Sequence, residues 1–312
     1  MESQDKFLSL PPNLLVILGP TASGKTAVAV QVARDLDGEI ISADSRQVYR
    51  GMDIGTGKDL REYGTISYHL MNIVDPGYAF NVFEFQRRFW EVFQDIRERG
   101  KIPLLVGGTG LYLEAVLKKY RMFEVPENPE LRRALSSFSL PGLVDLLQTL
   151  QPTLHNITDL LDRRRLIRAI EIAKFQKEVD PRSSSLPTLS PLVFGIRWER
   201  KILRRRITDR LRKRLQEGMI EEVRALLQSG ISHETLEFYG LEYRFVSQYL
   251  RGEIKFNDMF QRLNSAIHQF AKRQETWFRR MERGGIQIRW VEGAKEPAAA
   301  ILHEIRESFH IP

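Results

Sequence analysis

Cysteine is absent from this 312-residue sequence, which excludes disulfide bonds, thiolate catalysis and cysteine-ligated zinc. Histidine is scarce, and its six residues do not show the close spacing of metal ligands. No apolar run approaches the roughly 20 residues that a membrane-spanning helix needs. The first residues also lack the basic start and apolar centre of a signal peptide. We therefore expect a cytoplasmic protein that does not enter a membrane.

Positive charge is concentrated in the second part of the chain. Residues 1–125 contain 15 Lys and Arg against 16 Asp and Glu, and the whole chain contains 47 against 40, so the remainder carries 32 against 24. This asymmetry is typical of a protein in which one part binds a small molecule and the other a polyanion. A basic surface that contacts only solvent explains the same counts.

Three short apolar runs, at residues 13–19, 38–44 and 101–108, are rich in Ile, Val and Leu and end in turn residues, as buried parallel strands do. The segments between them have helical periodicity. The sequence therefore predicts an α/β fold with a parallel sheet, resembling the core of P-loop NTPases. We expect further strands at residues 191–198 and 286–293.

Residues 126–191 differ from the rest, because short helical stretches there are broken by PENPE, LPG and DPRSSSLPTLSP. This pattern predicts a helical insertion lobe, and residues 1–125 and 192–312 then form the catalytic core. Two long helices rich in Lys and Arg are predicted within residues 200–230 and 255–285.

A phosphate-binding loop follows the first predicted strand. GPTASGKT fits the pattern G-x-x-x-x-G-K-[ST] and precedes a predicted helix, which is the context that this motif requires. Its backbone N–H groups close on phosphate oxygens, Lys25 supplies a positive charge and the Thr26 hydroxyl can hold Mg²⁺. The expected phosphate-binding residues are Gly19, Pro20, Thr21, Ala22, Ser23, Gly24, Lys25 and Thr26.

The use of the bound phosphate is not settled by this loop alone. Kinases and nucleotidases keep an Asp at the end of another strand for Mg²⁺, but the strand at 101–108 ends in VGGTG without an acid. The candidate carboxylate is Asp44, at the end of the strand at 38–44 and close to the expected ligand edge of the sheet. The local sequence leaves three roles open for it, namely a metal ligand, a general base and a helix cap.

Five stretches resemble, in order, the tRNA dimethylallyltransferase family. They are GPTASGKT, SADSRQVYRGMDIGTGK, KIPLLVGGTGLYLEA, LDRRRLIRAIEI and FAKRQETWFRR, and the likeness extends from about Leu14 to Trp290. The resemblance implies that the loop holds the diphosphate of dimethylallyl diphosphate, which departs as a leaving group in the presence of Mg²⁺. It also implies that the five-carbon group is transferred to N6 of adenosine 37 in the anticodon loop of tRNA.

The resemblance also assigns roles to residues. Asp44 takes the proton of the adenine amine, which is a poor nucleophile because its lone pair is delocalised into the ring. Arg210 reaches the diphosphate, and with Asp44 and Thr26 it forms the expected catalytic set. The residues expected to contact tRNA are Asp44, Ser45, Arg46, Gln47, Thr109, Arg164, Arg165, Arg168, Tyr243 and Arg244.

Some positions depart from the family pattern. DIGTGKD stands for DIGTAKP, SYHL for PHHL, and GLEYRF for a segment that usually reads VGYRE. Arg244 is kept, whereas Glu242 replaces the usual Gly. Trp277 and Phe278 suit either RNA stacking or a buried core, and their spacing does not decide between the two.

Other functions fit parts of the sequence. A P-loop kinase with Asp44 as metal ligand and the lobe as a lid leaves the basic C-terminal helices unexplained. An adenylate isopentenyltransferase acting on free nucleotides does not need so large a basic surface. A tRNA-binding protein without enzymatic activity would not need Lys25, Thr26 and Asp44. We expect a monomeric enzyme.

Overall fold

The computed structural model describes residues 12–120, 122, 124–151, 161–178 and 186–309. The chain divides into two compact units, one formed by Met1–Tyr120 with Leu189–Pro312 and the other by Arg121–Thr188. The lobe predicted from the sequence, residues 126–191, begins and ends a few residues later than the second unit. No helix in the described part of the chain has the length and apolar character needed to cross a membrane.

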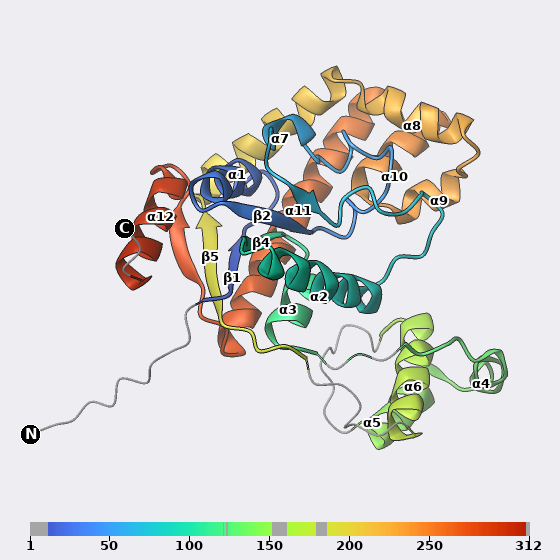
Figure 1. The fold of residues 1–312 in the computed structure, drawn as a ribbon. Helices are drawn as coiled ribbons and strands as arrows, with labels where there is room; N and C mark the ends of the chain where they lie inside the picture. The colour runs from blue at the N-terminus through green and yellow to red at the C-terminus, as the bar shows by residue number, and fades with distance from the viewer. Residues whose placement is uncertain (1–11, 121, 123, 152–160, 179–185, 310–312) are drawn as a thin grey trace, which may run out of the picture. The chain divides into compact units, whose positions relative to one another are not determined.

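The first unit is built on one parallel sheet of six strands in the order β3-β2-β4-β1-β5-β6 (Figure 1), which confirms the predicted α/β fold. The first strand, β1 (Leu14–Leu18), pairs with a neighbouring strand on each side, which places Leu15 beside Leu104 on one side and beside Leu192 on the other. Both of its faces are covered, which explains its unbroken apolar sequence. The strands are β1 (Leu14–Leu18), β2 (Gly38–Ala43), β3 (Tyr68–His69), β4 (Ile102–Gly107), β5 (Pro191–Arg197) and β6 (Arg289–Glu292).

Helices pack on both faces of this sheet. On one face, α1 (Lys25–Asp35) and α12 (Pro297–Phe309) share a core with β1, β4 and β5. On the other face lie α2 (Val82–Glu98) and α3 (Gly110–Leu117), where Phe85 stacks on Tyr112 with 4.1 Å between ring centroids. All strands run in the same direction, so the loops after β1, β2 and β4 meet at the carboxyl edge of the sheet.

A second core joins the C-terminal helices to the loop that follows β2. Leu211, Val223, Val246 and Leu263 of the helices pack with Tyr49 of that loop. The segment predicted as one basic helix divides at Gly218, whose φ of 100° ends helical continuation. The helices are α7 (Arg200–Gln216), α8 (Met219–Gln228), α9 (His233–Phe238), α10 (Leu241–Leu250) and α11 (Phe256–Arg283), and a short 3₁₀ turn, η1 (Leu60–Glu62), lies in the loop.

The second unit consists of three described helices, α4 (Pro129–Leu135), α5 (Leu140–Leu150) and α6 (Arg163–Glu178). They share a small core that includes Leu143, Leu147, Leu166 and Ile170. The side chains of Asn128 and Ser139 cap α4 and α5 by accepting backbone N–H groups, which fixes where these helices begin. This unit therefore has a core of its own.

Candidate active site at the carboxyl edge of the sheet

The phosphate-binding motif forms the loop between β1 and α1. Ala22 and Gly24 both have left-handed backbone angles, with φ of 62° and 84°, a conformation that turns successive N–H groups toward one point. Two carbonyls of the loop are held from outside, because Trp198 Nε1 donates to Ser23 O at 2.8 Å and Arg206 Nε donates to Ala22 O at 2.9 Å. The first turn of α1 therefore offers its free N–H groups at the edge of the sheet.

A long helix also fixes this loop. The Gln274 side chain of α11 accepts a hydrogen bond from Thr21 N at 2.8 Å and donates one to Gly108 O at 2.9 Å. One buried amide thus joins the loop to the end of β4. Sequence reasoning did not identify Gln274 for this role, because its two partners are far away in the chain.

Charged groups of both signs surround Lys25. Burial lowers the pKa of its ammonium group from 10.5 to about 8, Asp44 and Asp59 oppose this shift, and Arg210 and Arg214 add to it. Neighbouring cations that disfavour one another's charge are stabilised by a bound anion. Burial raises the pKa of the Tyr63 hydroxyl, and the Thr26 side chain opposes this shift.

Asp44 leaves β2 at the same edge. Its Oδ1 accepts the N–H of Arg46 at 2.9 Å and caps a turn, and no helix begins at residues 45–48. Among the three roles left open by the sequence, the structure does not bear out the helix cap. Thr109 lies beside it, because Thr109 Oγ1 accepts the N–H of Ser45 at 3.1 Å and Thr109 N donates to Ala43 O at 3.3 Å.

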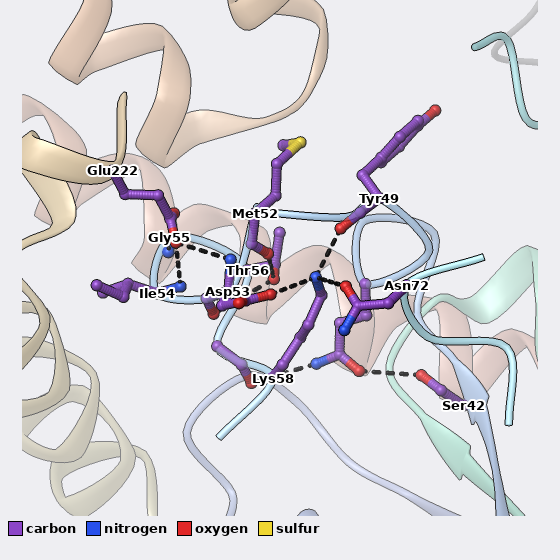
Figure 2. Close-up of polar contacts among 12 residues, drawn as sticks. Ser42, Tyr49, Met52, Asp53, Ile54, Gly55, Thr56, Lys58, Asn72 and Glu222 are labelled. Carbon is purple, nitrogen blue, oxygen red and sulfur yellow. Dashed lines mark hydrogen bonds and ion pairs between the residues drawn. The ribbon is translucent and has the colours of Figure 1, made fainter. Parts of the chain in front are cut away.

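Two charged side chains hold the loop at residues 52–58 (Figure 2). Glu222 of α8 accepts the N–H groups of Asp53, Ile54 and Gly55 at 2.7, 2.6 and 2.9 Å. Lys58 is fully buried, and its Nζ donates to three oxygens. These are Tyr49 O at 2.6 Å, Asp53 Oδ1 at 2.6 Å and Asn72 Oδ1 at 2.5 Å.

Arg210 of α7 lies on this loop. Its Nη2 donates to Asp59 Oδ2 at 2.7 Å and to Gly57 O at 3.3 Å. Burial raises the pKa of the Asp59 carboxyl, but Arg210 and Arg214 outweigh it and lower that pKa overall. A narrow cavity between the phosphate-binding loop and α7 is lined by Thr21, Ala22, Ile207, Arg210, Leu211, Arg214, Glu242 and Ile267.

Two residues expected to contact tRNA have inward contacts here. Tyr243 is only 1% exposed, and its hydroxyl donates to Glu222 Oε1 at 2.7 Å. The Gln47 side chain accepts from Ser42 Oγ at 2.9 Å and donates to Gly57 O at 3.2 Å. Both side chains support the loop at residues 52–58 from within.

Other expected tRNA contacts lie at the surface. Arg244 is exposed, and the Arg46 guanidinium lies 5.3 Å from the ring centroid of Phe238, which is 66% exposed. In the second unit, Arg164 and Arg165 are exposed. Arg168 is instead half-buried, with hydrogen bonds to Glu171 at 3.0 Å and Val125 O at 2.6 Å.

The two aromatic residues left undecided by the sequence both face inward. Phe278 is fully buried. Trp277 packs against Gly110 and donates from Nε1 to Glu114 at 3.0 Å. Phe278 is therefore a core residue, whereas Trp277 is half-buried and has the Arg280 guanidinium 4.0 Å from its ring centroid.

The metal-binding capacity of the site is limited to individual oxygen ligands. Among the described residues, no group of three His, Asp or Glu side chains is arranged to hold a metal ion. Thr26 offers a hydroxyl oxygen, a ligand type that suits Mg²⁺ when substrate phosphates supply most of the coordination. The site therefore fits a magnesium ion that arrives with a phosphorylated substrate.

Comparisons with known proteins agree across the chain. The family model described as IPP transferase matches residues 47–281, and the model described as isopentenyl transferase matches residues 12–65. The chain is 66% identical over 285 residues to tRNA dimethylallyltransferase 1 of Geotalea uraniireducens (strain Rf4), covering 91% of this chain and 94% of that protein. It is 63% identical to tRNA dimethylallyltransferase 2 of Syntrophotalea carbinolica, with 93% and 97% covered.

Solved structures give the same picture. The full-length tRNA isopentenylpyrophosphate transferase of Bacillus halodurans has a TM-score of 0.67 and 32% identity, with 95% of this chain and 97% of that chain covered. A eukaryotic dimethylallyltransferase described as acting on tRNA has a TM-score of 0.76 and 25% identity, with 95% and 78% covered.

Proposed function

This chain belongs to the IPP transferase family and is a tRNA dimethylallyltransferase, and on that premise we propose how its residues divide the reaction. The donor is dimethylallyl diphosphate and the acceptor is N6 of adenosine 37 in the anticodon loop of tRNA. The bond from C1 of the donor to its bridging oxygen breaks, and its electron pair leaves with diphosphate. The N6 lone pair forms the new bond to C1, and N6 loses one proton.

Diphosphate binds in the loop formed by residues 19–26. Support comes from the left-handed angles of Ala22 and Gly24, the free N–H groups at the start of α1, and the influence of the Arg210 and Arg214 cations on Lys25. Negative charge grows on diphosphate as the allylic bond breaks, so cations fixed in advance stabilise the transition state more than the substrate. Lys25 and Arg210 supply this charge.

The Thr26 hydroxyl would hold a magnesium ion together with oxygens of the substrate. Bound there, the ion would neutralise part of the charge that develops on the leaving group. Asp44 is not needed as a ligand in this arrangement, because diphosphate oxygens can supply the anionic positions.

Asp44 acts as the general base for the N6 proton. Support comes from its position at the end of β2, where the electrostatic influence of its carboxylate reaches Lys25. The Arg46 N–H and the contact between Ser45 and Thr109 fix the turn that carries it. A carboxylate held in this way accepts the proton as charge develops on the amine.

The tRNA is bound by exposed basic residues and by residues near Asp44. Ser45, Arg46 and Thr109 lie at the acceptor position, and Phe238 offers an exposed ring face on which a base can stack. Further along the chain, Arg164, Arg165 and Arg244 contact backbone phosphates. Gln47, Tyr243 and Arg168 contribute by supporting their neighbours. The enzyme acts as a monomer in the cytoplasm, where its tRNA substrate is found.

The proposal rests chiefly on one observation, that Asp44, the phosphate-binding loop and Arg210 meet at one edge of the sheet. The test is incubation of hypomodified tRNA with the protein, Mg²⁺ and dimethylallyl diphosphate, followed by mass analysis of nucleosides. We expect dimethylallylated adenosine at position 37 and no product from free adenosine monophosphate. Product from the free nucleotide alone would favour the adenylate isopentenyltransferase alternative, and ATP hydrolysis without prenyl transfer would favour a kinase-like activity.

A further inference from the structure

A buried ion pair lies beside the phosphate-binding loop. Its members are Glu242 of α10 and Arg214 of α7, with 3.5 Å between Arg214 Nη1 and Glu242 Oε1. Both side chains line the narrow cavity that also contains Thr21 and Arg210. The pair therefore faces the place where we propose that diphosphate binds.

Arg214 has too few hydrogen-bond partners for a buried guanidinium group. The residue is 7% exposed, and Nη1 donates to Gly55 O at 3.3 Å, a long hydrogen bond. Its Nε is buried and has no hydrogen-bond partner in the part of the chain that the structure describes. An unsatisfied buried donor on a cation is costly, and an anion in the cavity would relieve that cost.

Two guanidinium groups crowd the same short stretch of backbone. A side chain at position 57 would overlap both Arg210 and Arg214, and Gly57 is in the left-handed region with φ of 62°. Both arginines therefore lie directly against Gly57. Two guanidinium cations packed against the same glycine repel each other unless negative charge lies between them.

Burial disfavours the charge on both members of the ion pair. Burial lowers the pKa of Arg214 to about 10, Arg210 adds to that shift, and Glu242 and Asp59 oppose it. Burial also raises the pKa of Glu242. The ionised form of each partner is thus disfavoured by its surroundings, and their separation of 3.5 Å compensates only in part.

We propose that Arg214 is a second diphosphate-binding arginine and that Glu242 is its counterion, which competes with the diphosphate for it. This inference rests on the proposed function of the loop at residues 19–26. The carboxylate balances the positive charge of Arg214 when diphosphate is absent and weakens the binding of the product, which must leave after transfer.

The directions in which two substitutions change the affinity for diphosphate distinguish this role from a purely structural one. Neutralising Glu242 should free Arg214 for the anion, so E242Q should bind diphosphate more tightly than the unmodified protein. Removing the arginine should weaken binding, so R214M should act in the opposite direction. A pair that only stabilises the fold predicts lower stability in both variants and no gain of affinity in either.

The experiment is calorimetric titration of the full chain with inorganic diphosphate and Mg²⁺, together with the KM for dimethylallyl diphosphate at saturating tRNA. We expect affinity to rise several-fold in E242Q and to fall about tenfold or more in R214M. The double variant R214M/E242Q should match R214M, because Glu242 acts through Arg214. R212Q is the control, since Arg212 lies on the same helix, pairs with exposed Asp209 at 3.1 Å and lies 5.8 Å from the ring centroid of Phe260, and it should not change affinity.

An unchanged or weaker affinity in E242Q would overturn the inference, even if R214M proved too unstable to titrate. So would an R214M variant that folds and binds diphosphate normally. Measurements on the unmodified protein distinguish a failure of this inference from a failure of the proposed function. If it dimethylallylates tRNA while E242Q fails to gain affinity, only the counterion role is wrong, whereas failure to bind diphosphate at all would count against the proposed site.

Discussion

Substitution of Glu222 by Gln should destabilise the active-site loop by an amount that the hydrogen bonds allow us to work out. Glu222 Oε2 accepts the N–H groups of Asp53 and Ile54, and Oε1 accepts Gly55 N–H and the Tyr243 hydroxyl. Glutamine keeps one of these oxygens and places an NH₂ group where the other was, so two hydrogen bonds to the charged group are lost and at least one backbone N–H then faces another donor. Hydrogen bonds to a charged group contribute about 1.5–3 kcal/mol each, which gives a loss of about 3–6 kcal/mol for E222Q.

Thermal unfolding measures this loss. A chain of this size shifts its melting temperature by roughly 2 °C per kcal/mol, so we expect a decrease of about 6–12 °C. E221Q is the control, because Glu221 is the adjacent residue, is exposed and forms a 3.6 Å pair with Arg224, which contributes little. The KM for dimethylallyl diphosphate should also rise in E222Q, because the loop positions Gly57 O and Asp59 for Arg210. A melting temperature equal to that of E221Q would refute the reasoning.

Three further predictions concern the substrates. Burial holds the Lys25 pKa at about 8, and a bound anion raises it again. Diphosphate binding should therefore be accompanied by more proton uptake at Lys25 at about pH 9 than at about pH 7. Calorimetric titration in buffers of different ionisation enthalpy measures this uptake, and equal uptake at both pH values would contradict the prediction. F238A should weaken tRNA binding by roughly fivefold to a hundredfold because a base can no longer stack on the ring, and the KM for dimethylallyl diphosphate should not change. The control is F256A, which removes another exposed ring. Equal effects of the two substitutions on tRNA binding would contradict the stacking role of Phe238. The double substitution of Arg164 and Arg165 by Gln should lower the salt dependence of tRNA binding by about one unit of slope for each phosphate that these arginines neutralise, and an unchanged slope would leave the two residues as solvent-exposed surface.

The parts of the fold that depend on local pattern were predictable from the sequence. β1, β2 and β4 are apolar because they are buried on both faces, and the phosphate-binding loop has a fixed spacing of glycines, Lys25 and Thr26. β3 was missed, since two residues that pair with Ile40 and Ile41 leave no periodic signal. The division of the basic helix at Gly218 was also missed, because a glycine within a helical pattern does not by itself reveal a left-handed turn.

The contacts that complete the site join residues far apart in the chain. Glu222 lies 167 residues from Gly55, and Gln274 lies 253 residues from Thr21. No local pattern distinguishes these two polar residues from exposed ones on the same helices. Tyr243 shows the opposite case, because a motif that suggested an RNA contact places its hydroxyl on Glu222 instead.

The most direct test of the proposed mechanism is the single-turnover rate of D44N with saturating tRNA and dimethylallyl diphosphate. The amide keeps the size of Asp44 and the oxygen that accepts the Arg46 N–H, but it cannot take the N6 proton. We predict that the rate falls by about 10²- to 10⁴-fold, while the affinities for tRNA, diphosphate and Mg²⁺ stay unchanged. D75N is the control, because Asp75 is an exposed carboxylate paired with Arg50. Weakened binding of Mg²⁺ and diphosphate in D44N, with activity restored by additional Mg²⁺, would contradict the general-base role and identify Asp44 as a metal ligand.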